Sequence, residues 1–144
     1  MAFYPYLFFG RDCRQAFEFY KQVFGGELVL ITMNDMPSDQ PMPPDQGDLI
    51  MHAALKFDDG QLLMGSDDPT TENPGPVTGM MVNYSVPEVE EATKAFDALA
   101  DGGEVRLQIG PTAWSAAFGM CVDRFGTPWM VSADSPQSDS PQSG

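Results

Sequence analysis

The stretch AFEFYKQVFGGE at residues 16–27 predicts an amphipathic helix that ends at a pair of glycines, and the chain repeats this pattern as AFDALADGGE at residues 95–104. In the first copy the apolar residues recur at the three-and-four-residue spacing of one helical face. Gly25-Gly26 and Gly102-Gly103 are predicted to end the two helices, because glycine adopts the backbone conformation that follows a helix at little cost. The repeat predicts a chain built from two copies of one structural unit.

Strand patterns flank each predicted helix in the same order. Asp12 is expected to cap the first helix through its side chain. A turn at Asp58-Asp59-Gly60 is expected to join two strands as a hairpin. The predicted strands cover residues 2–9, 27–33, 49–57 and 61–66 in the first copy and residues 80–86, 104–109, 114–122 and 127–133 in the second. Each copy is therefore predicted to run strand, helix, strand, strand, strand, which is a βαβββ module.

Two such modules are expected to pack together, because neither can bury both faces of its own sheet alone. The predicted fold is α+β, with two βαβββ modules forming a curved mixed β-sheet cup. Residues 1–133 are predicted to be a single domain, with module one at 1–68, a Pro/Gly-rich linker at 69–78 and module two at 79–133. The polar repeats at 134–144 predict a disordered tail.

Composition limits the classes of partner. The 144 residues carry a formal net charge of −14, which repels nucleic acid and anionic lipid surfaces and attracts cations. No apolar run is long enough to predict a membrane span. Two cysteines, Cys13 and Cys121, and the lack of a charged-then-apolar leader predict a reduced, cytoplasmic protein. Cys13, next to the predicted helix cap, is a weak candidate for a nucleophile.

The segments PYLFF, AFEFY and VFGGE near the start and VDRFGTPWM near the end give the chain a resemblance to a known family. They resemble the vicinal oxygen chelate superfamily of glyoxalase I, bleomycin-resistance proteins and extradiol dioxygenases, and within it the PhnB-like branch. The resemblance covers residues 3 to about 133 and implies the two-module fold and a homodimer. It implies no single reaction, because this scaffold hosts unrelated chemistries.

Metal-dependent members of that superfamily place His, Gln or Glu ligands on the first and last strands of each module. Carried over to this sequence, the four positions fall on Pro5, Met64, Met81 and Met130. Proline has no donor side chain, and thioethers suit copper(I) better than zinc, nickel, magnesium or iron(II). The expectation is therefore no divalent metal and no cofactor, with the methionines as apolar filling; a copper(I) site made by the three methionines is the alternative.

His52 is the only histidine in the chain. Strand alternation predicts Ile50, His52, Ala54 and Lys56 toward the cup, and the residues between them, Leu49, Met51, Ala53, Leu55 and Phe57, under the helix. A hydrogen-bonded structural role and a role as catalytic acid or base both fit a lone histidine, whose reference pKa near 6.5 suits proton transfer.

The remaining candidate site residues are those expected to face the cup or its rim. Trp114 is expected either to form an aromatic wall or to pack in the core. The predicted ligand-binding residues are Met64, Met81, Asn83, Trp114, Met130 and Ser132. An apolar pocket with a few polar groups is the usual composition of a small-molecule site.

Two functions follow as hypotheses. In the first, the protein binds a small organic molecule, such as a cationic drug, without a divalent metal. In the second, it is a glyoxalase-like lyase or isomerase that uses His52 as general base, with the Pro-rich loop at 34–47 as a lid. A methyltransferase activity is not supported, because the chain lacks the glycine-rich strand-turn-helix pattern of a nucleotide cofactor site.

Overall fold

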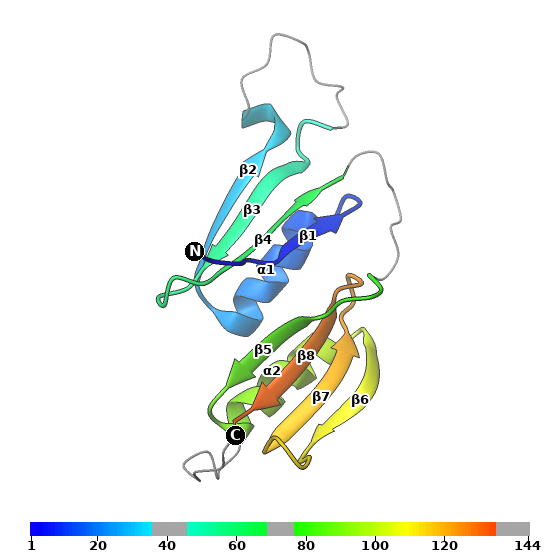
Figure 1. Cartoon of the computed structure of the whole chain (residues 1–144). Coiled ribbons are helices and arrows are strands. Elements are labelled where there is room, and N and C mark those ends of the chain that lie inside the picture. The colour runs from blue at the N-terminus through cyan, green and yellow to red at the C-terminus, as the bar shows by residue number, and fades with distance from the viewer. Residues whose placement is uncertain (36–45, 69–76, 135–144) are drawn as a thin grey trace. The chain divides into compact units, whose positions relative to one another are not determined.

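A computed structural model describes residues 1–35, 46–68 and 77–134 of the chain (Figure 1). The chain divides into two compact units, Met1–Pro74 and Gly75–Gly144. Most of the predicted loop at 34–47, most of the linker at 69–78 and nearly all of the tail at 134–144 lie outside the described residues, so the predictions made for them stay predictions. No helix within the described ranges is long and apolar enough to cross a membrane.

The first unit is a four-stranded mixed sheet with one helix on one face (Figure 1). The strand order is β1-β4-β3-β2, with β1 parallel to β4 and the other neighbours antiparallel. Its elements are β1 (Tyr6–Phe9), α1 (Cys13–Phe24), β2 (Glu27–Thr32), the 3-10 turn η1 (Met33–Asp35), β3 (Ile50–Lys56) and β4 (Leu62–Asp67).

The second unit has the same topology. Its strands follow the order β5-β8-β7-β6, again with one parallel pair, β5 with β8. Its elements are β5 (Val82–Val86), α2 (Val89–Ala100), β6 (Glu104–Gly110), β7 (Ala117–Val122) and β8 (Pro128–Ala133). The α+β class and the two βαβββ modules predicted from the repeat are thus confirmed, and neither sheet is closed.

The core of each unit lies between its helix and one face of its sheet. The apolar stripes of the two helices are buried, with Cys13, Ala16, Phe17 and Tyr20 on α1 and Ala92, Ala95, Phe96 and Leu99 on α2. Burial of each large apolar side chain contributes on the order of 1.5–3 kcal/mol to folding. This packing leaves the opposite face of each sheet to carry the candidate site residues.

The cap of α1 differs from the prediction. Asp12 stands at the N-cap, but its side chain makes no capping hydrogen bond. The backbone N–H of Cys13 instead donates to Oδ1 of buried Asp67 at 2.9 Å, and the N–H of Ile50 donates to Oδ2 of the same residue at 2.8 Å. A carboxylate at the end of β4 therefore satisfies the first turn of a helix far from it in sequence, which local capping rules do not detect.

The predicted alternation on β3 is wrong at one end. Ala53 and Leu55 are fully buried on the helix side as expected, but Ile50 is also fully buried and Met51 is exposed. The register with β2 shifts between Ile31, which faces His52, and Thr32, which faces Ile50. This bulge inserts one extra residue into β3 and exchanges the expected positions of Ile50 and Met51, whereas His52 keeps the face opposite the helix.

Candidate ligand site on the second sheet

The face of the second sheet opposite α2 gathers side chains from three strands. Asn83 on β5 lies directly opposite Met130 on β8, and Met130 lies opposite Met120 on β7. Two residues further along β8, Ser132 lies opposite Phe118 on β7. Because residues paired across neighbouring strands point to the same face, these five side chains share one surface.

An open depression of about 370 Å³ lies on this surface, a size within the range of small-molecule sites. The residues that line it are Asn83, Trp114, Ser115, Phe118, Met130, Ser132, Ala133 and Asp134. The structure thus brings together four of the six residues that the sequence predicted as ligand-binding: Asn83, Trp114, Met130 and Ser132. Their binding role itself stays a prediction.

Trp114 is an aromatic wall of the depression and not a core residue. Its side chain is 68% exposed, and its ring meets Phe118 edge-on with the centroids 5.6 Å apart. Trp114 precedes β7, which begins at Ala117 and not at residue 114 as predicted. The loop before β7, and not alternation along a strand, therefore brings Trp114 beside Phe118.

The loop that carries Trp114 is fixed by hydrogen bonds. The backbone N–H groups of Trp114 and Ser115 donate to Oγ1 of Thr112 at 3.3 and 3.1 Å. The buried Ser115 hydroxyl lies 2.6 Å from the carbonyl of Ala117 and 2.5 Å from that of Ala133, so it ties the loop to the ends of β7 and β8. The indole is therefore presented on a constrained turn, which lowers the entropy lost when a ligand stacks on it.

Asp134 was missed as a site residue. It had been assigned to the polar tail, but its backbone N–H donates to the carbonyl of Val86 at 3.0 Å, which holds it at the end of the sheet beside the depression. The parallel pairing of β5 with β8 brings this residue to the site, and the sequence contains no local signal of that pairing.

The remaining two predicted residues do not line the depression. Met81 precedes β5 and is half-buried, and Met64 belongs to β4 of the first sheet. In the strand registers, Tyr6 lies opposite Met64 and Asn83 lies opposite Met130. The assignment of the superfamily's ligand positions to Pro5, Met64, Met81 and Met130 stays a prediction.

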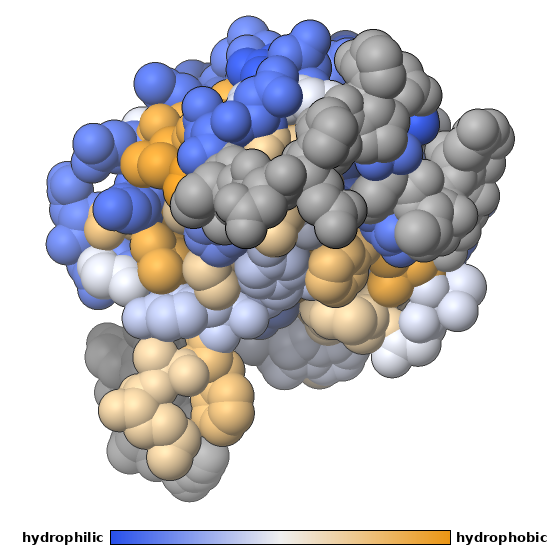
Figure 2. Space-filling model, turned by 90° about the horizontal axis from the view of Figure 1, so that it is seen from above, coloured by the Kyte–Doolittle hydropathy of each residue, from blue (hydrophilic) through white to orange (hydrophobic). Residues whose placement is uncertain are grey.

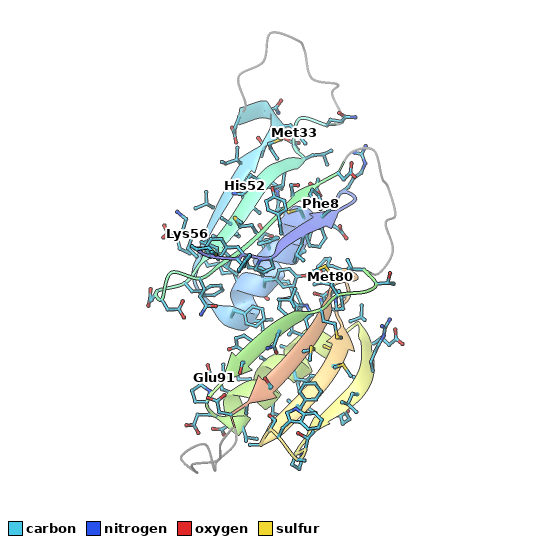
Figure 3. All side chains as sticks on the ribbon, viewed as in Figure 1. Phe8, Met33, His52, Lys56, Met80 and Glu91 are labelled. Carbon is cyan, nitrogen blue, oxygen red and sulfur yellow. The ribbon has the colours of Figure 1, made fainter. Side chains whose placement is uncertain are left out.

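His52 lies on the open face of the first sheet, with a hydrogen-bond partner that the sequence did not identify. Its Nδ1 is 3.1 Å from the hydroxyl of Tyr6, and the two ring centroids are 5.7 Å apart. Phe8 continues the row, with its ring centroid 5.3 Å from that of Tyr6 (Figure 3). The alternation of β1, with Leu7 and Phe9 buried, was the available sequence signal for Tyr6 and Phe8 on this face.

These donors do not fit a divalent metal of the kind the superfamily uses. The four assigned positions carry a proline and three thioethers, and the residues opposite Met64 and Met130 add a phenol and an amide, whereas zinc, nickel and iron(II) prefer imidazole, carboxylate or thiolate. Within residues 1–35, 46–68 and 77–134, no three His, Cys, Asp or Glu side chains are grouped to hold an ion. No metal-dependent step follows from this site, and metal-free binding stays a prediction.

Neither cysteine is positioned to act as a nucleophile. Cys13 and Cys121 are fully buried free thiols. Burial raises the pKa of Cys13 far above its ordinary value, and the charge of Asp67 adds to the effect. Burial, with a smaller contribution from Asp123, raises the pKa of Cys121 to about 11. Both side chains therefore stay protonated at neutral pH and are poor nucleophiles.

The visible surface of the molecule is mixed in character. Figure 2 shows hydrophilic residues over much of the visible face, with hydrophobic residues exposed between them. The large hydrophobic side chains that are more than half exposed include Phe8, Met80 and Trp114. Two of these belong to the open sheet faces described above, Phe8 on the first sheet and Trp114 on the second.

Comparison with known proteins identifies the class of protein that has this fold of two βαβββ units and an open-faced site. Residues 4–131 match the Glyoxalase/Bleomycin resistance protein/Dioxygenase superfamily, and the chain belongs to it. The protein YjdN of Escherichia coli K12 is 30% identical over 142 residues, which cover 91% of this chain and 94% of YjdN.

Two solved structures illustrate the similarity. Protein PA1353 from Pseudomonas aeruginosa is 39% identical and has a TM-score of 0.81, over 94% of this chain and 98% of that one. A Bacillus cereus PhnB protein, titled a putative 3-demethylubiquinone-9 3-methyltransferase, shares the fold with a TM-score of 0.72 at 22% identity, over 92% of this chain and 99% of that one. At this identity the match shows the shared fold alone.

Proposed function

We propose that the protein binds a small, planar, cationic organic molecule in the depression of the second sheet, without a divalent metal. The observation that carries the proposal is the exposed Trp114 ring, held on a constrained turn at the edge of a depression of about 370 Å³. A flat ring can stack on this indole, and its charge is attracted by the aromatic face.

The polar groups of the depression favour the same ligand class. Asn83 and Ser132 offer hydrogen bonds, Asp134 offers a carboxylate, and neither lysine nor arginine is among the described residues that line the depression. The formal net charge of −14 attracts cations to the whole molecule. Together these features disfavour an anionic ligand.

The fluorescence of Trp114 provides the test. The chain has two tryptophans, and the other, Trp129, is only 2% exposed and donates its Nε1–H to Asp123. Saturable quenching is expected with N-methylquinolinium, and weaker binding with its neutral analogue 1-methylnaphthalene and with the anion 1-naphthoate. The variant Trp114→Phe, in which only Trp129 reports, should lose the saturable signal.

Two controls test the contributions of the Asp134 charge and of a bound metal. Asp134→Asn should weaken binding of the cation by roughly two- to fivefold, as an exposed charge contributes up to about 1 kcal/mol, and should leave binding of the neutral analogue unchanged. Treatment with a chelator should not alter the affinity. Equal affinity for the cation and the anion would contradict the proposal. So would stoichiometric zinc, nickel or iron in the purified protein, together with binding that a chelator abolishes.

A glyoxalase-like lyase or isomerase with His52 as base is the second candidate. The observation in its favour is that the ring is half-buried on an open sheet face and oriented by Tyr6. It requires an unprotonated nitrogen on the side of the ring that a substrate can reach. The protonation of the two ring nitrogens therefore separates this candidate from a role for His52 in binding alone.

A further inference from the structure

We propose that Tyr6 positions His52 as a hydrogen-bond donor to the carbonyl oxygen of a neutral aromatic compound bound on the open face of the first sheet. The inference rests on residues of β1 and β3 alone. It assigns a role to Tyr6, which no sequence pattern indicated.

The first step concerns the shared proton. Tyr6 Oη and His52 Nδ1 are 3.1 Å apart, and either group can donate in this pair. A phenol is a stronger acid than a neutral imidazole, and the unprotonated ring nitrogen is a better acceptor than a phenol oxygen. The favoured arrangement is therefore Tyr6 O–H donating to Nδ1, which leaves the proton of the neutral ring on Nε2.

The second step concerns access to Nε2. Among the described residues, no buried side-chain nitrogen or oxygen lacks a hydrogen-bond partner. The His52 ring is half-buried and its hydrogen bond is made by Nδ1, so Nε2 must be accessible to solvent. An accessible N–H on a neutral ring can donate to a ligand but cannot take a proton from it.

The third step concerns the ligand. Tyr6 is 38% exposed and Phe8 is 62% exposed, and their neighbouring rings provide an aromatic surface beside the donor. The nearest cation along β3 on the same face, Lys56, is four residues away, roughly 13 Å by strand rise. A carboxylate would thus find no cation of β3 beside the donor, in a protein of net charge −14, whereas a neutral aryl carbonyl needs only that donor and the rings.

The sole histidine makes the test direct, because a long-range proton–nitrogen NMR spectrum of the ¹⁵N-labelled protein contains one imidazole pattern. In mildly alkaline solution the wild type should carry its ring proton on Nε2. Tyr6→Phe should shift the Nδ1 signal downfield, toward that of a nitrogen without a hydrogen bond. Tyr4→Phe, which removes an exposed hydroxyl two residues away, should leave the pattern unchanged. A wild-type proton on Nδ1, or a Tyr6→Phe spectrum like that of the wild type, would overturn the inference.

Ligand recognition is read from the same signals. Benzamide should shift the Nε2 resonance saturably in the wild type and bind several-fold more weakly to Tyr6→Phe, whereas toluene, which lacks the carbonyl, should have little effect. If benzamide and toluene act alike, no acceptor is recognised and the inference is refuted. Because Trp114 fluorescence reports the other sheet, failure here is distinguishable from failure of the proposed function.

Discussion

Asp67 shows how much a single buried side chain contributes to this fold. Its two carboxylate oxygens accept backbone N–H groups from Cys13, at the start of α1, and from Ile50, at the start of β3. The residue itself is only 5% exposed. One carboxylate at the end of β4 therefore fixes the ends of two other elements of the first unit.

We expect Asp67→Asn to lower the free energy of unfolding by about 2–3 kcal/mol, because hydrogen bonds to a charged acceptor are among the strong ones and the amide NH₂ cannot accept. Urea denaturation at neutral pH measures the change. The matched control is Asp48→Asn, an exposed carboxylate on the same unit, which should change stability by a few tenths of a kcal/mol. Equal effects of the two substitutions would contradict this account.

The buried thiols give stability a dependence on alkaline pH. The pKa of Cys121 is raised to about 11 by burial first and by Asp123 second, whereas an unfolded thiol titrates near pH 8.5. Between these values the unfolded chain has lost a proton that the folded chain retains, so the free energy of unfolding falls as pH rises.

We therefore expect the urea midpoint to fall between about pH 8.5 and 11, and to fall less steeply in Cys121→Ala. Because the raised pKa of Tyr84 acts in the same direction, only the difference between wild type and variant isolates the thiol. Parallel pH profiles for the two proteins would show that burial of Cys121 has no such effect.

At the scale of elements, glycines set how closely each helix approaches its sheet. A Cβ placed on Gly65 of β4 would lie 2.8 Å from the Phe17 ring of α1 and 2.7 Å from the carbonyl of Leu7. A Cβ on Gly119 of β7 would lie 2.9 Å from the Phe96 ring of α2. In both units a phenylalanine of the helix occupies the space left by a strand glycine.

Gly65→Ala should destabilise the protein by about 1–3 kcal/mol, because it overpacks a region bounded by backbone. Gly110→Ala is the control, since a Cβ there meets nothing within 4 Å and its backbone is not left-handed. Thermal and urea unfolding of both variants check the prediction. If the two alanine substitutions have the same effect, contact with Phe17 does not limit the helix-to-sheet distance.

At the scale of the whole molecule, the repeat explains the order of the elements. Helices of 12 residues and sheets of identical strand order occur in both units. The backbone N–H groups of Asp68 and Asp134 bond to the ends of β1 and β5 in the same way. Equivalent positions nevertheless carry different residues. In the first sheet Tyr6 is paired with Met64, whereas in the second sheet Asn83 is paired with Met130.

That divergence gives the two open faces different chemistry. The first carries a phenol–imidazole pair beside exposed aromatic rings, and the second carries an indole, an amide and a carboxylate around a depression. Expected homodimer formation and a cytoplasmic location remain proposals. Gel filtration with light scattering tests the first of them directly.

The sequence by itself determined the eight strands, the two helices and their duplication. Hydrophobic periodicity and the glycines that end a helix are local signals, which lie within the residues of each element. It also placed Asn83, Met130 and Ser132 on a shared face, since alternation along a regular strand follows from backbone geometry. Only the tertiary structure decided that Asp67 caps α1, that a bulge buries Ile50, that Tyr6 bonds His52 and that Asp134 joins Trp114 at a depression. Each of these depends on the register between strands distant in sequence. Register is fixed by packing between distant segments, so no short stretch of residues determines it.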